Sequence, residues 1–551
     1  MPARRLLPAL LLAAVIASIA PLAHAEGTPL GPVPSEDLSR PAVKADGHGG
    51  ALVTYKTASL KVGAIHVNAN GLADGGLGFA PAVMPFTLEA AEPMRVALPT
   101  DTQVVLGSDR ATSASPVLTS MRTGGAASPG FPVGLAMPHL HPVLVAGLGG
   151  RTLIVSKNDD ATTYWTLRAA ILGANGQVQS SVQLPSPVQF FNADQLDATT
   201  DGAGGLIAVF PYYDASGGGS KDIAVFRYTS SGARPWGDVP RPVVFAPQDQ
   251  VDPHVIADGV GGVLFAWTDP RTSGNGSDIY ALHIDRDAQR LPGWDFYGQP
   301  VCDAIGEQSQ PRLAQDGFGG AWVVWKDQRS DLAGDLRYSH VLSNGAFASG
   351  FTSSGLQLVT AAGVQGEARI AGDGAGGIFA VWRDERSGNA DIYIQHVLAN
   401  GTLPAGWPVN GKPLTTAAGT QEQPAIASTG AGRVLVVWRD ARTSPSRIYA
   451  AAVVDAGTTA VPVTGGGALR ISASAASPTE VRLRLSLPTA GTARVEVVDV
   501  SGRRLASREC SGPLDAATVT LRAAVPLEPG RYFARVTQDG ASASTGVIVL
   551  R

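Results

Sequence analysis

The chain has 551 residues, of which 66 are glycine and 39 are proline, and 16% of its residues are charged. This composition excludes a disordered chain, collagen and a coiled coil, while a hydrophobic share of 44% is enough for a large core. The formal net charge of −4 gives no field that would gather polyanions, so nucleic acid is not an expected partner.

The first 25 residues have the pattern of a secretory signal peptide. Arg4 and Arg5 form a basic start, residues 6–22 are apolar, and Ala23-His24-Ala25 is a small-x-small cleavage signal. We therefore expect the mature protein to begin near Glu26 and to be secreted or held at the cell surface. No later stretch approaches the about 18 apolar residues of a membrane span, so no transmembrane segment is expected.

One short peptide recurs between residues 26 and 457 and divides this part of the chain into units. Asp-Gly-x-Gly-Gly occurs five times, and weaker copies lie around Ala146 and at Thr429. The steps from 201 through 258, 316 and 373 to 429 are 57, 58, 57 and 56 residues. A further anchor is expected near Asp101, which predicts eight units of about 45–58 residues. The five anchoring aspartates are Asp46, Asp201, Asp258, Asp316 and Asp373.

Each unit is expected to fold as four antiparallel strands. In the seventh unit these strands are predicted at 368–371, 378–382, 391–398 and 412–415. Asp-Gly and Asn-Gly supply the positive φ angles of hairpin turns, and no window shows a helical period, so the chain is predicted to be all-β. Four strands repeated eight times predict an eight-bladed β-propeller, with seven blades as the alternative. An open β-solenoid is the less favoured architecture.

A large apolar side chain stands nine residues after most of the anchors. Its place on the second strand of each unit predicts packing between blades, and the alternative is a platform on which a sugar stacks. The residues are Tyr55, Val155, Phe210, Trp267, Trp325, Trp382 and Trp438.

An Asp and an Arg follow the tryptophan by two and four residues in the last four units. We expect these pairs at one end of the ring, where each carboxylate accepts loop N–H groups and each guanidinium contacts a neighbouring acceptor. They are also the candidate binding residues for a charged or sugar ligand. Units one to four lack the pair, apart from a shortened Asp109-Arg110. The candidates are Asp269, Arg271, Asp327, Arg329, Asp384, Arg386, Asp440 and Arg442.

Neither a metal nor a cofactor is expected. Four histidines occupy one position of the third strand, which lies about 10 Å outward from the first strand, so imidazoles of different blades diverge and cannot share a zinc ion. Packing between blades is the preferred interpretation of these residues. His139 and His141 give only two ligands, and Asp-Gly-x-Gly-Gly is typical of a turn and not of a calcium loop. The four histidines are His66, His283, His340 and His396.

No catalytic residue is predicted, because the chain has no nucleophile elbow, Walker loop, His-Glu-x-x-His or Cys-x-x-Cys motif. Carboxylates for glycoside hydrolysis would have to come from distant loops. Acids that break the repeat pattern and meet near the axis would favour an enzyme, whereas finding only the Asp–Arg pairs there would favour binding.

The repeat stops after Val454, and residues 458–467 are interpreted as a linker. Residues 468–551 alternate in the manner of a small β-sandwich of about seven strands. The two cysteines, Cys302 and Cys510, exclude a disulfide scaffold. Two buried thiols are expected, and a bond between them is the less favoured alternative.

Two motifs in this last segment carry a family resemblance. Residues 495–503 read Val-x-Val-x-Asp-x-x-Gly-Arg, and residues 527–536 read Leu-x-Pro-Gly-x-Tyr-Phe-x-Arg-Val, before an apolar strand that ends in a basic residue. This order resembles the type IX secretion C-terminal sorting domain. The resemblance implies an Ig-like sandwich that the secretion machinery recognises. The related hook-capping type of Ig-like module fits almost as well, and Ala476-Ser477-Pro478 stands where the sorting family commonly has Asn-Pro.

These observations favour an exported or cell-surface, non-enzymatic propeller that presents loops to a glycan or protein ligand. The expected partner of the C-terminal domain is a type IX-like secretion machinery. The alternative is a propeller hydrolase or lyase that acts on polysaccharide in the central depression.

Overall fold

A computed structural model gives the structure of the protein. It describes residues 27–30, 36–46, 49–59, 61–73, 82–87, 95–100, 103–107, 117–122, 133–134, 140–159, 165–175, 177–184, 195–213, 220–271, 274, 276–430, 432–455, 470–477, 479–487, 491–498, 504–511, 514–523, 526–528, 530–538 and 541–549. The predicted signal peptide (1–25) and linker (458–467) lie outside the described residues. So do Asp101, Asp109, Arg110, His139 and the side chain of His141.

Up to Asp455 the described residues form eight four-stranded antiparallel sheets. The first contains β2 (Leu38–Ala45), β3 (Ala51–Thr57), β4 (Lys61–Val67) and β5 (Ala82–Thr87). The second contains β6 (Arg95–Thr100), β7 (Gln103–Gly107), β8 (Val117–Arg122) and β9 (Val133–Gly134). The third contains β10 (Leu140–Ala146), β11 (Thr152–Asp159), β12 (Trp165–Leu172) and β13 (Val178–Gln183). The fourth contains β14 (Asp197–Thr200), β15 (Leu206–Tyr213), β16 (Lys221–Tyr228) and β17 (Arg241–Val244).

The remaining four sheets follow the same order. The fifth contains β18 (Val251–Ala257), β19 (Val263–Asp269), β20 (Asp278–Ile284) and β21 (Gln299–Cys302). The sixth contains β22 (Gln308–Gln315), β23 (Ala321–Asp327), β24 (Asp335–Val341) and β25 (Leu356–Val359). The seventh contains β26 (Gln365–Gly372), β27 (Ile378–Asp384), β28 (Asp391–Val397) and β29 (Lys412–Thr415). The eighth contains β30 (Gln421–Gly430), β31 (Arg433–Asp440), β32 (Arg447–Val454) and, from the start of the chain, β1 (Thr28–Pro29).

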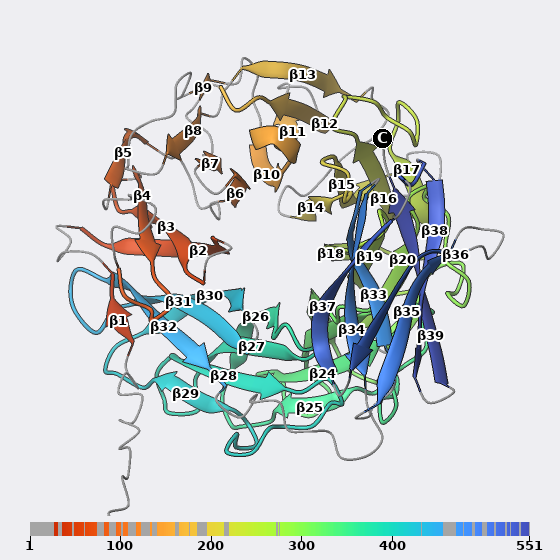
Figure 1. Ribbon diagram of the computed structural model, residues 1–551. Coiled ribbons are helices and arrows are strands. Elements are labelled where there is room, and N and C mark those ends of the chain that lie inside the picture. Colours follow the sequence, from red (N-terminus) through yellow and green to blue (C-terminus); the bar gives the residue numbers. More distant parts are fainter. Residues whose placement is uncertain are drawn as a thin grey trace, which may run out of the picture.

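The sheets follow one another around a circle (Figure 1). The first strand of each sheet, such as β2, β18 or β26, lies toward the centre, and the later strands lie progressively outward. Each sheet can bury both faces only against its neighbours, and the repeated tryptophans of the second strands are fully buried there. The arrangement is β-propeller-like, and the prediction of an all-β chain is confirmed.

Residues near the start of the chain complete the eighth sheet. Thr28 pairs with Ala450 and Pro29 with Tyr449, so β1 is the outer strand beside β32. One apolar cluster joins the first and last sheets, with Leu38 and Val53 packed in the same group as Leu435. The ends of the repeat region are therefore joined both by backbone pairing and by a shared core.

The anchoring aspartates form turns, as the sequence indicates, but they also bind the third strand. In the sixth sheet, Oδ1 of Asp316 accepts the N–H groups of Phe318 and Gly320 at 2.7 and 3.0 Å. Its Oδ2 accepts a hydrogen bond of 2.9 Å from Nε2 of His340. The prediction that the histidines serve in packing is thus incomplete, because His340 stacks on Trp322 at 4.2 Å between ring centroids and is also the partner of the anchor.

The same pair recurs around the ring. His66, His283 and His396 bind Asp46, Asp258 and Asp373 at 2.8, 3.2 and 3.0 Å. In the fourth sheet Arg227 replaces the histidine and contacts Asp201 at 3.0 Å. In the third and eighth sheets both partners are absent together. The N–H of Gly147 donates to the carbonyl oxygen of Arg151, as that of Asp316 does to Gly320, so in the third sheet the anchor position is Gly147, one residue after the Ala146 that the sequence repeat indicates. Gly147 and Thr429 thus stand at the anchor, and Ile171 and Ala452 at the third-strand position.

The described residues from Arg470 onward form two more antiparallel sheets. One contains β33 (Arg470–Ala476), β34 (Glu480–Leu487) and β37 (Leu514–Arg522). The other contains β36 (Arg504–Ser511), β35 (Thr492–Val498), β38 (Gly530–Gln538) and β39 (Ala541–Val549). Their apolar cluster runs from Ile471 to Val549 and includes no residue of the eight earlier sheets.

Both cysteines are free thiols. Cys302 is buried, and burial raises the pKa of its thiol to about 11, so thiolate chemistry is not expected there. Cys510 is only half-buried, which corrects the expectation that both thiols lie in a core.

Candidate functional site

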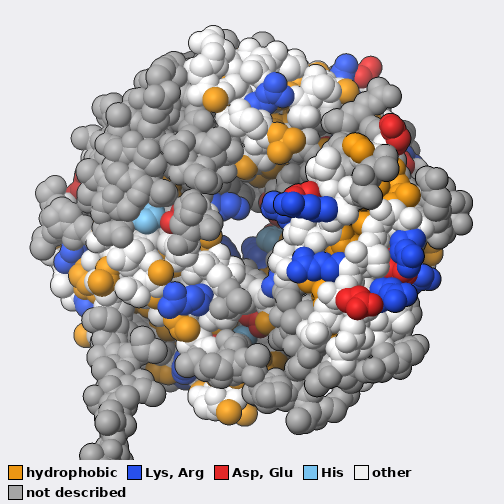
Figure 2. Space-filling view, viewed as in Figure 1, with side chains coloured by type: hydrophobic (Ala, Val, Ile, Leu, Met, Phe, Trp, Pro, Cys, Tyr) orange, Lys and Arg blue, Asp and Glu red, His pale blue; other side chains and the backbone are white. Residues whose placement is uncertain are grey.

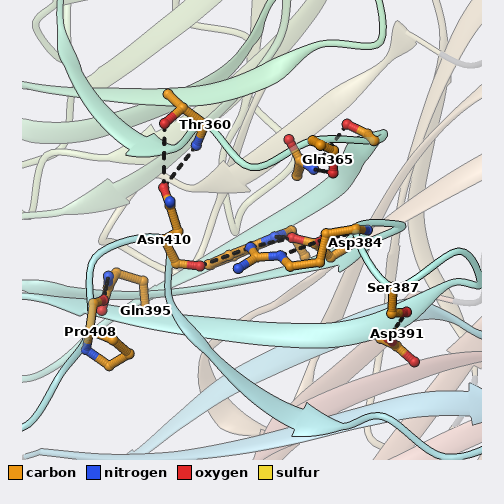
Figure 3. A network of polar contacts seen from close by, with 12 residues as sticks. Thr360, Gln365, Asp384, Ser387, Asp391, Gln395, Pro408 and Asn410 are labelled. Carbon is orange, nitrogen blue, oxygen red and sulfur yellow. Dashed lines mark hydrogen bonds and ion pairs between the residues drawn. The ribbon is translucent and has the colours of Figure 1, made fainter.

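The four predicted Asp–Arg pairs lie at the ends of the second strands. Each arginine binds the aspartate of its own sheet, and Arg329 and Arg442 also contact Cys302 and Thr415 of the preceding sheet. Figure 3 shows the surroundings of Asp384 in the seventh sheet, with Asn410 and Thr360 beside it. Oδ2 of Asp384 accepts hydrogen bonds from Trp382 Nε1 at 2.7 Å and from Arg386 Nη2 at 2.6 Å, and Oδ1 accepts the backbone N–H of Arg386 at 3.0 Å. The same Nη2 reaches the carbonyl oxygen of Asn410 at 2.9 Å, and Asn410 in turn accepts the N–H of Thr360.

The other three pairs repeat these contacts. The tryptophan donates to the carboxylate at 2.7 to 3.0 Å in each, and the guanidinium contacts the same carboxylate at 2.6 or 2.7 Å. Three of the four guanidiniums also stack over a tyrosine of the third strand, as Arg386 does over Tyr393 at 4.0 Å. The four aspartates are 0 to 1% exposed. Each carboxylate therefore already accepts hydrogen bonds from its loop and from its tryptophan. The four residues are Asp269, Asp327, Asp384 and Asp440.

A second group of polar residues, which the sequence did not single out, lines the centre of the ring. A cavity of about 580 Å³ lies between the first strands of six sheets, β2, β14, β18, β22, β26 and β30. Figure 2 shows the opening at the centre of the molecule, with charged side chains at its edge. We call this cavity the axial channel. Its polar lining residues are Arg40, Asp197, Asp252, His254, Arg312, Glu367, Arg369 and Gln423.

Five of the first strands carry a β-bulge at one register, and the bulged residue is left-handed in every case. Its φ lies between 52° and 56°, although none of the five residues is glycine. Such a conformation costs of order 1–3 kcal/mol per residue and is found mainly where a fold or a site requires it. Four of the five line the axial channel, and Gln310 lines the cavity beside it. The bulged residues are Arg40, Asp252, Gln310, Glu367 and Gln423.

On one side of the channel the bulged side chains link neighbouring sheets. The Oε2 atom of Glu367 accepts the N–H of Gln423 at 2.7 Å, and Oε1 of Gln423 accepts the N–H of Arg40 at 2.7 Å. This chain of contacts joins the seventh, eighth and first sheets. Asp252 and Gln310 have no equivalent contact among the described residues, so the linkage is interrupted between the fifth and sixth sheets and between the sixth and seventh.

Two residues after the bulge, a second row of side chains faces the same channel. On the first strands of the fourth to seventh sheets this row is charged or ionisable: Asp197, His254, Arg312 and Arg369. At the same register the first and eighth sheets have Ala42 and Ala425. In this second row the lining is therefore polar over one sector and small and apolar over the other, whereas the bulged Arg40 and Gln423 keep polar groups in the apolar sector.

Backbone groups fix two members of this row. The N–H of Val255 donates to Oδ2 of Asp197 at 3.0 Å, and the N–H of Leu313 donates to Nδ1 of His254 at 3.3 Å. Because Nδ1 of His254 is an acceptor, the neutral ring carries its proton on Nε2. His254 can thus donate from Nε2 but cannot accept a proton there.

Asp252 is the carboxylate that the backbone leaves unused. Its side chain is about a third exposed, and its Oδ2 lies 3.7 Å from Nη1 of Arg312. Burial raises the pKa of Asp252, the guanidiniums of Arg312 and Arg369 oppose that rise, and the Asp197 carboxylate adds to it. The outcome is a carboxyl group that holds its proton to higher pH than an ordinary aspartate.

A second cavity, of about 500 Å³, shares Asp252, Arg312, Glu367 and Arg369 with the axial channel. Thr268 lines it and is 5% exposed, and its hydroxyl has no hydrogen-bond partner among the described residues. A buried polar group without a partner costs about 1–3 kcal/mol, which a ligand hydroxyl or water at this place would offset.

Among the described residues, no three His, Cys, Asp or Glu side chains are grouped closely enough to bind a metal ion together. The structure also describes no helix with the length and apolar character that a bilayer crossing requires.

A sequence signal for the channel existed, but it lies outside the anchor motif. Eight residues before four of the anchors stands a fully buried glutamine, and a proline usually follows three residues later. Two residues after this glutamine comes the bulged position, whose identity changes from unit to unit. The glutamines are Gln250, Gln308, Gln365 and Gln421.

No protein family model matches the chain, and no curated protein matches it. Among solved structures, a protein of unknown function from Dyadobacter fermentans is 12% identical, with a TM-score of 0.37 over 78% of this chain and 98% of that chain. PorZ, a surface component of the type IX secretion system of Porphyromonas gingivalis, is 11% identical, with a TM-score of 0.33 over 93% of this chain and 70% of PorZ. An α-L-arabinanase of Penicillium chrysogenum is 12% identical, with a TM-score of 0.32 over 55% of this chain and 90% of that chain. At these values the likenesses say nothing of activity.

Proposed function

We propose that this protein is an exported or cell-surface binding protein, and that its ligand enters the axial channel of a closed, eight-bladed β-propeller. Residues 1–25 are its signal peptide, and residues 468–551 are an Ig-like module for secretion by a type IX-like machinery or for attachment. The Asp–Arg pairs at the ends of the second strands hold the rim of the ring. Eight four-stranded sheets in chain order, and the pairing of β1 with β32, support this architecture.

The observation that carries the binding function is the row of left-handed residues in the channel. A repeat protein can fill an inner-strand position with one residue type in several units, as this chain does with its four buried glutamines. At the bulge the types are instead Arg, Asp, Gln, Glu and Gln, held in a strained conformation at one register. A position with constant backbone and variable chemistry is typical of a binding surface on a rigid scaffold.

A second function, hydrolysis of a polysaccharide, is favoured by one specific observation. Asp197, Asp252 and Glu367 break the repeat pattern and line the same channel, and the pKa of Asp252 is raised as a general acid requires. Two of these carboxylates, however, each accept a backbone N–H of the neighbouring sheet. Binding without turnover is therefore the preferred function, and Asp252 would be the acid if turnover occurs.

The test uses the full chain from Glu26 to Arg551. Binding to an array of glycans and peptides is measured first, and the ligands found are then incubated with the protein and assayed for new reducing ends or unsaturated products. We expect binding without product. Turnover that Asp252→Asn abolishes would establish the enzyme instead, and the lack of any ligand across the array would overturn binding in the channel.

A further inference from the structure

The two arginines of the axial channel are placed alike on neighbouring first strands. Arg312 on β22 and Arg369 on β26 occupy the same register, paired with Val324 and Val381 of their second strands. In each, Nη1 donates to the carbonyl oxygen of the preceding residue, at 2.7 and 2.9 Å. The chain's own backbone thus orients both guanidiniums at the wall of one cavity.

The carboxylate that pairs with Arg312 is a weak partner. Asp252 lies 3.7 Å from Arg312, whereas the rim pairs of this protein close to 2.6 or 2.7 Å. A planar carboxylate can form two short parallel hydrogen bonds with a guanidinium, and Arg is suited to this bidentate contact. Asp252 does not make it, so the position for a better-placed carboxylate is open.

We infer that the axial channel binds the carboxylate of an acidic saccharide of the uronic acid class, with Arg312 and Arg369 as the anchoring cations. This inference rests on the proposed binding function and specifies the chemical class of its ligand.

Charge balance in the channel limits how anionic the ligand can be. Three arginines line it, and so do three carboxylates, those of Asp197, Asp252 and Glu367. A densely charged polymer such as a polysulfate would be repelled by these acids, whereas single carboxylates separated by hydroxyls would not.

Three uncharged polar side chains at the two cavities suit the hydroxyl groups of a saccharide. Gln310, Gln423 and the unpartnered Thr268 offer donors and acceptors to hydroxyl groups. Among the described residues that line the two cavities there is no Phe, Tyr or Trp, so a saccharide would be held there by hydrogen bonds and ion pairs and not by stacking on a large ring.

The experiment measures the affinity of the full chain for trigalacturonate by calorimetry. Its methyl ester, maltotriose, dextran sulfate and an acidic peptide are measured beside it. We expect trigalacturonate to bind, the ester to bind at least about tenfold more weakly, and Arg312→Gln and Arg369→Gln each to lose about tenfold. Arg241→Gln, which removes an arginine from the outer strand of the fourth sheet, is the matched control and leaves the affinity unchanged.

The outcomes separate this inference from the proposed function. The uronic acid assignment is overturned if the affinity is unchanged by methyl esterification or by both arginine substitutions. It is also overturned if dextran sulfate or the peptide binds more tightly than trigalacturonate. In either case the proposed binding function still stands. If no probe binds and the wider array gives no ligand either, both proposals fail. Circular dichroism of each variant confirms that lost affinity is not lost folding.

Discussion

Carboxylates in this protein have two kinds of partner, and the difference separates scaffold from site. Asp316 and Asp384 each accept from the backbone and from a buried side chain within their own sheet, and both are 2% exposed or less. Asp252 has neither kind of contact and keeps only a guanidinium at 3.7 Å. Removing a scaffold carboxylate would leave buried donors unsatisfied, whereas removing Asp252 would change only the chemistry of the channel.

Asp252 should make the binding of a carboxylate depend on pH. Its pKa is raised, chiefly by burial, so the group is neutral at low pH and becomes charged at a higher pH than an ordinary aspartate. The charge appears beside Arg312 and competes with the ligand. Affinity for trigalacturonate should therefore fall as pH rises through the pKa of Asp252, and Asp252→Asn should hold the low-pH affinity throughout.

Calorimetry at a series of pH values above the titration range of the ligand checks this expectation. The other charged groups that face Asp252 are Asp197, Glu367, Arg312, Arg369 and His254. His254→Gln, which removes the neighbouring imidazole, is the control and should keep the pH dependence. A dependence that survives Asp252→Asn and disappears in His254→Gln would assign the effect to the histidine.

At the scale of elements, β1 has only two residues and yet completes the eighth sheet. Gly27 precedes it, with φ at +66°, and a Cβ placed there would lie 2.3 Å from the ring of Trp438. Gly298, Gly355 and Gly411 stand in the same relation to Trp267, Trp325 and Trp382. In the eighth sheet β1 and the glycine before it therefore take the place of the fourth strand and of the glycine that packs on the tryptophan in the other sheets.

Gly27→Ala should open the ring at this point. The added methyl group collides with Trp438, so we expect the propeller to lose about 1–3 kcal/mol more than a glycine substitution without a collision. Gly259→Ala is that control, because Gly259 has a φ of +82° but no atom within 4 Å of the added Cβ. Hydrogen exchange at Tyr449 and Ala450, which pair with β1, should speed up in Gly27→Ala alone. Equal effects of the two substitutions would contradict this account of ring closure.

The elements themselves could be predicted from the sequence because their signals are local and repeated. The strands found at 378–384 and 391–397 follow the expected ones within two residues. The role of β1 was missed, although Gly27-Thr28-Pro29-Leu30 parallels Gly411-Lys412-Pro413-Leu414. The signal is four residues long and lies almost the whole repeat region away from its partner strand.

The candidate site could not be predicted in the same way, for a physical reason. The Asp–Arg pairs recur from unit to unit, and a feature that recurs in this way indicates a structural role in each sheet before it indicates a ligand site. The channel residues come together only when the first strands converge. The direction of their side chains depends on a left-handed bulge, and the residue types at Asp252 and Glu367 do not predict such a bulge. The Asp–His pairing was within reach, because Gly147 and Ile171, like Thr429 and Ala452, show both partners lost together.

At the scale of the whole molecule, the two parts of the chain have separate cores. Among the residues that the structure describes, the clusters of the eight sheets contain none beyond Val453, and the cluster of the C-terminal sheets contains none before Ile471. Cooperative unfolding follows shared burial, so each core should unfold as its own unit.

Scanning calorimetry of the full chain should show two transitions with separate responses to substitution. Val495 is fully buried in the C-terminal cluster, and Val495→Ala should cost about 2 kcal/mol there. In a domain of this size that loss corresponds to a shift of roughly 8 °C or more. Gly27→Ala should move only the larger transition, and by fewer degrees per kcal/mol, because a larger unit has a larger unfolding entropy. A single transition that both substitutions shift would show that the parts unfold together, and the ring could not then be treated as a scaffold that stands by itself.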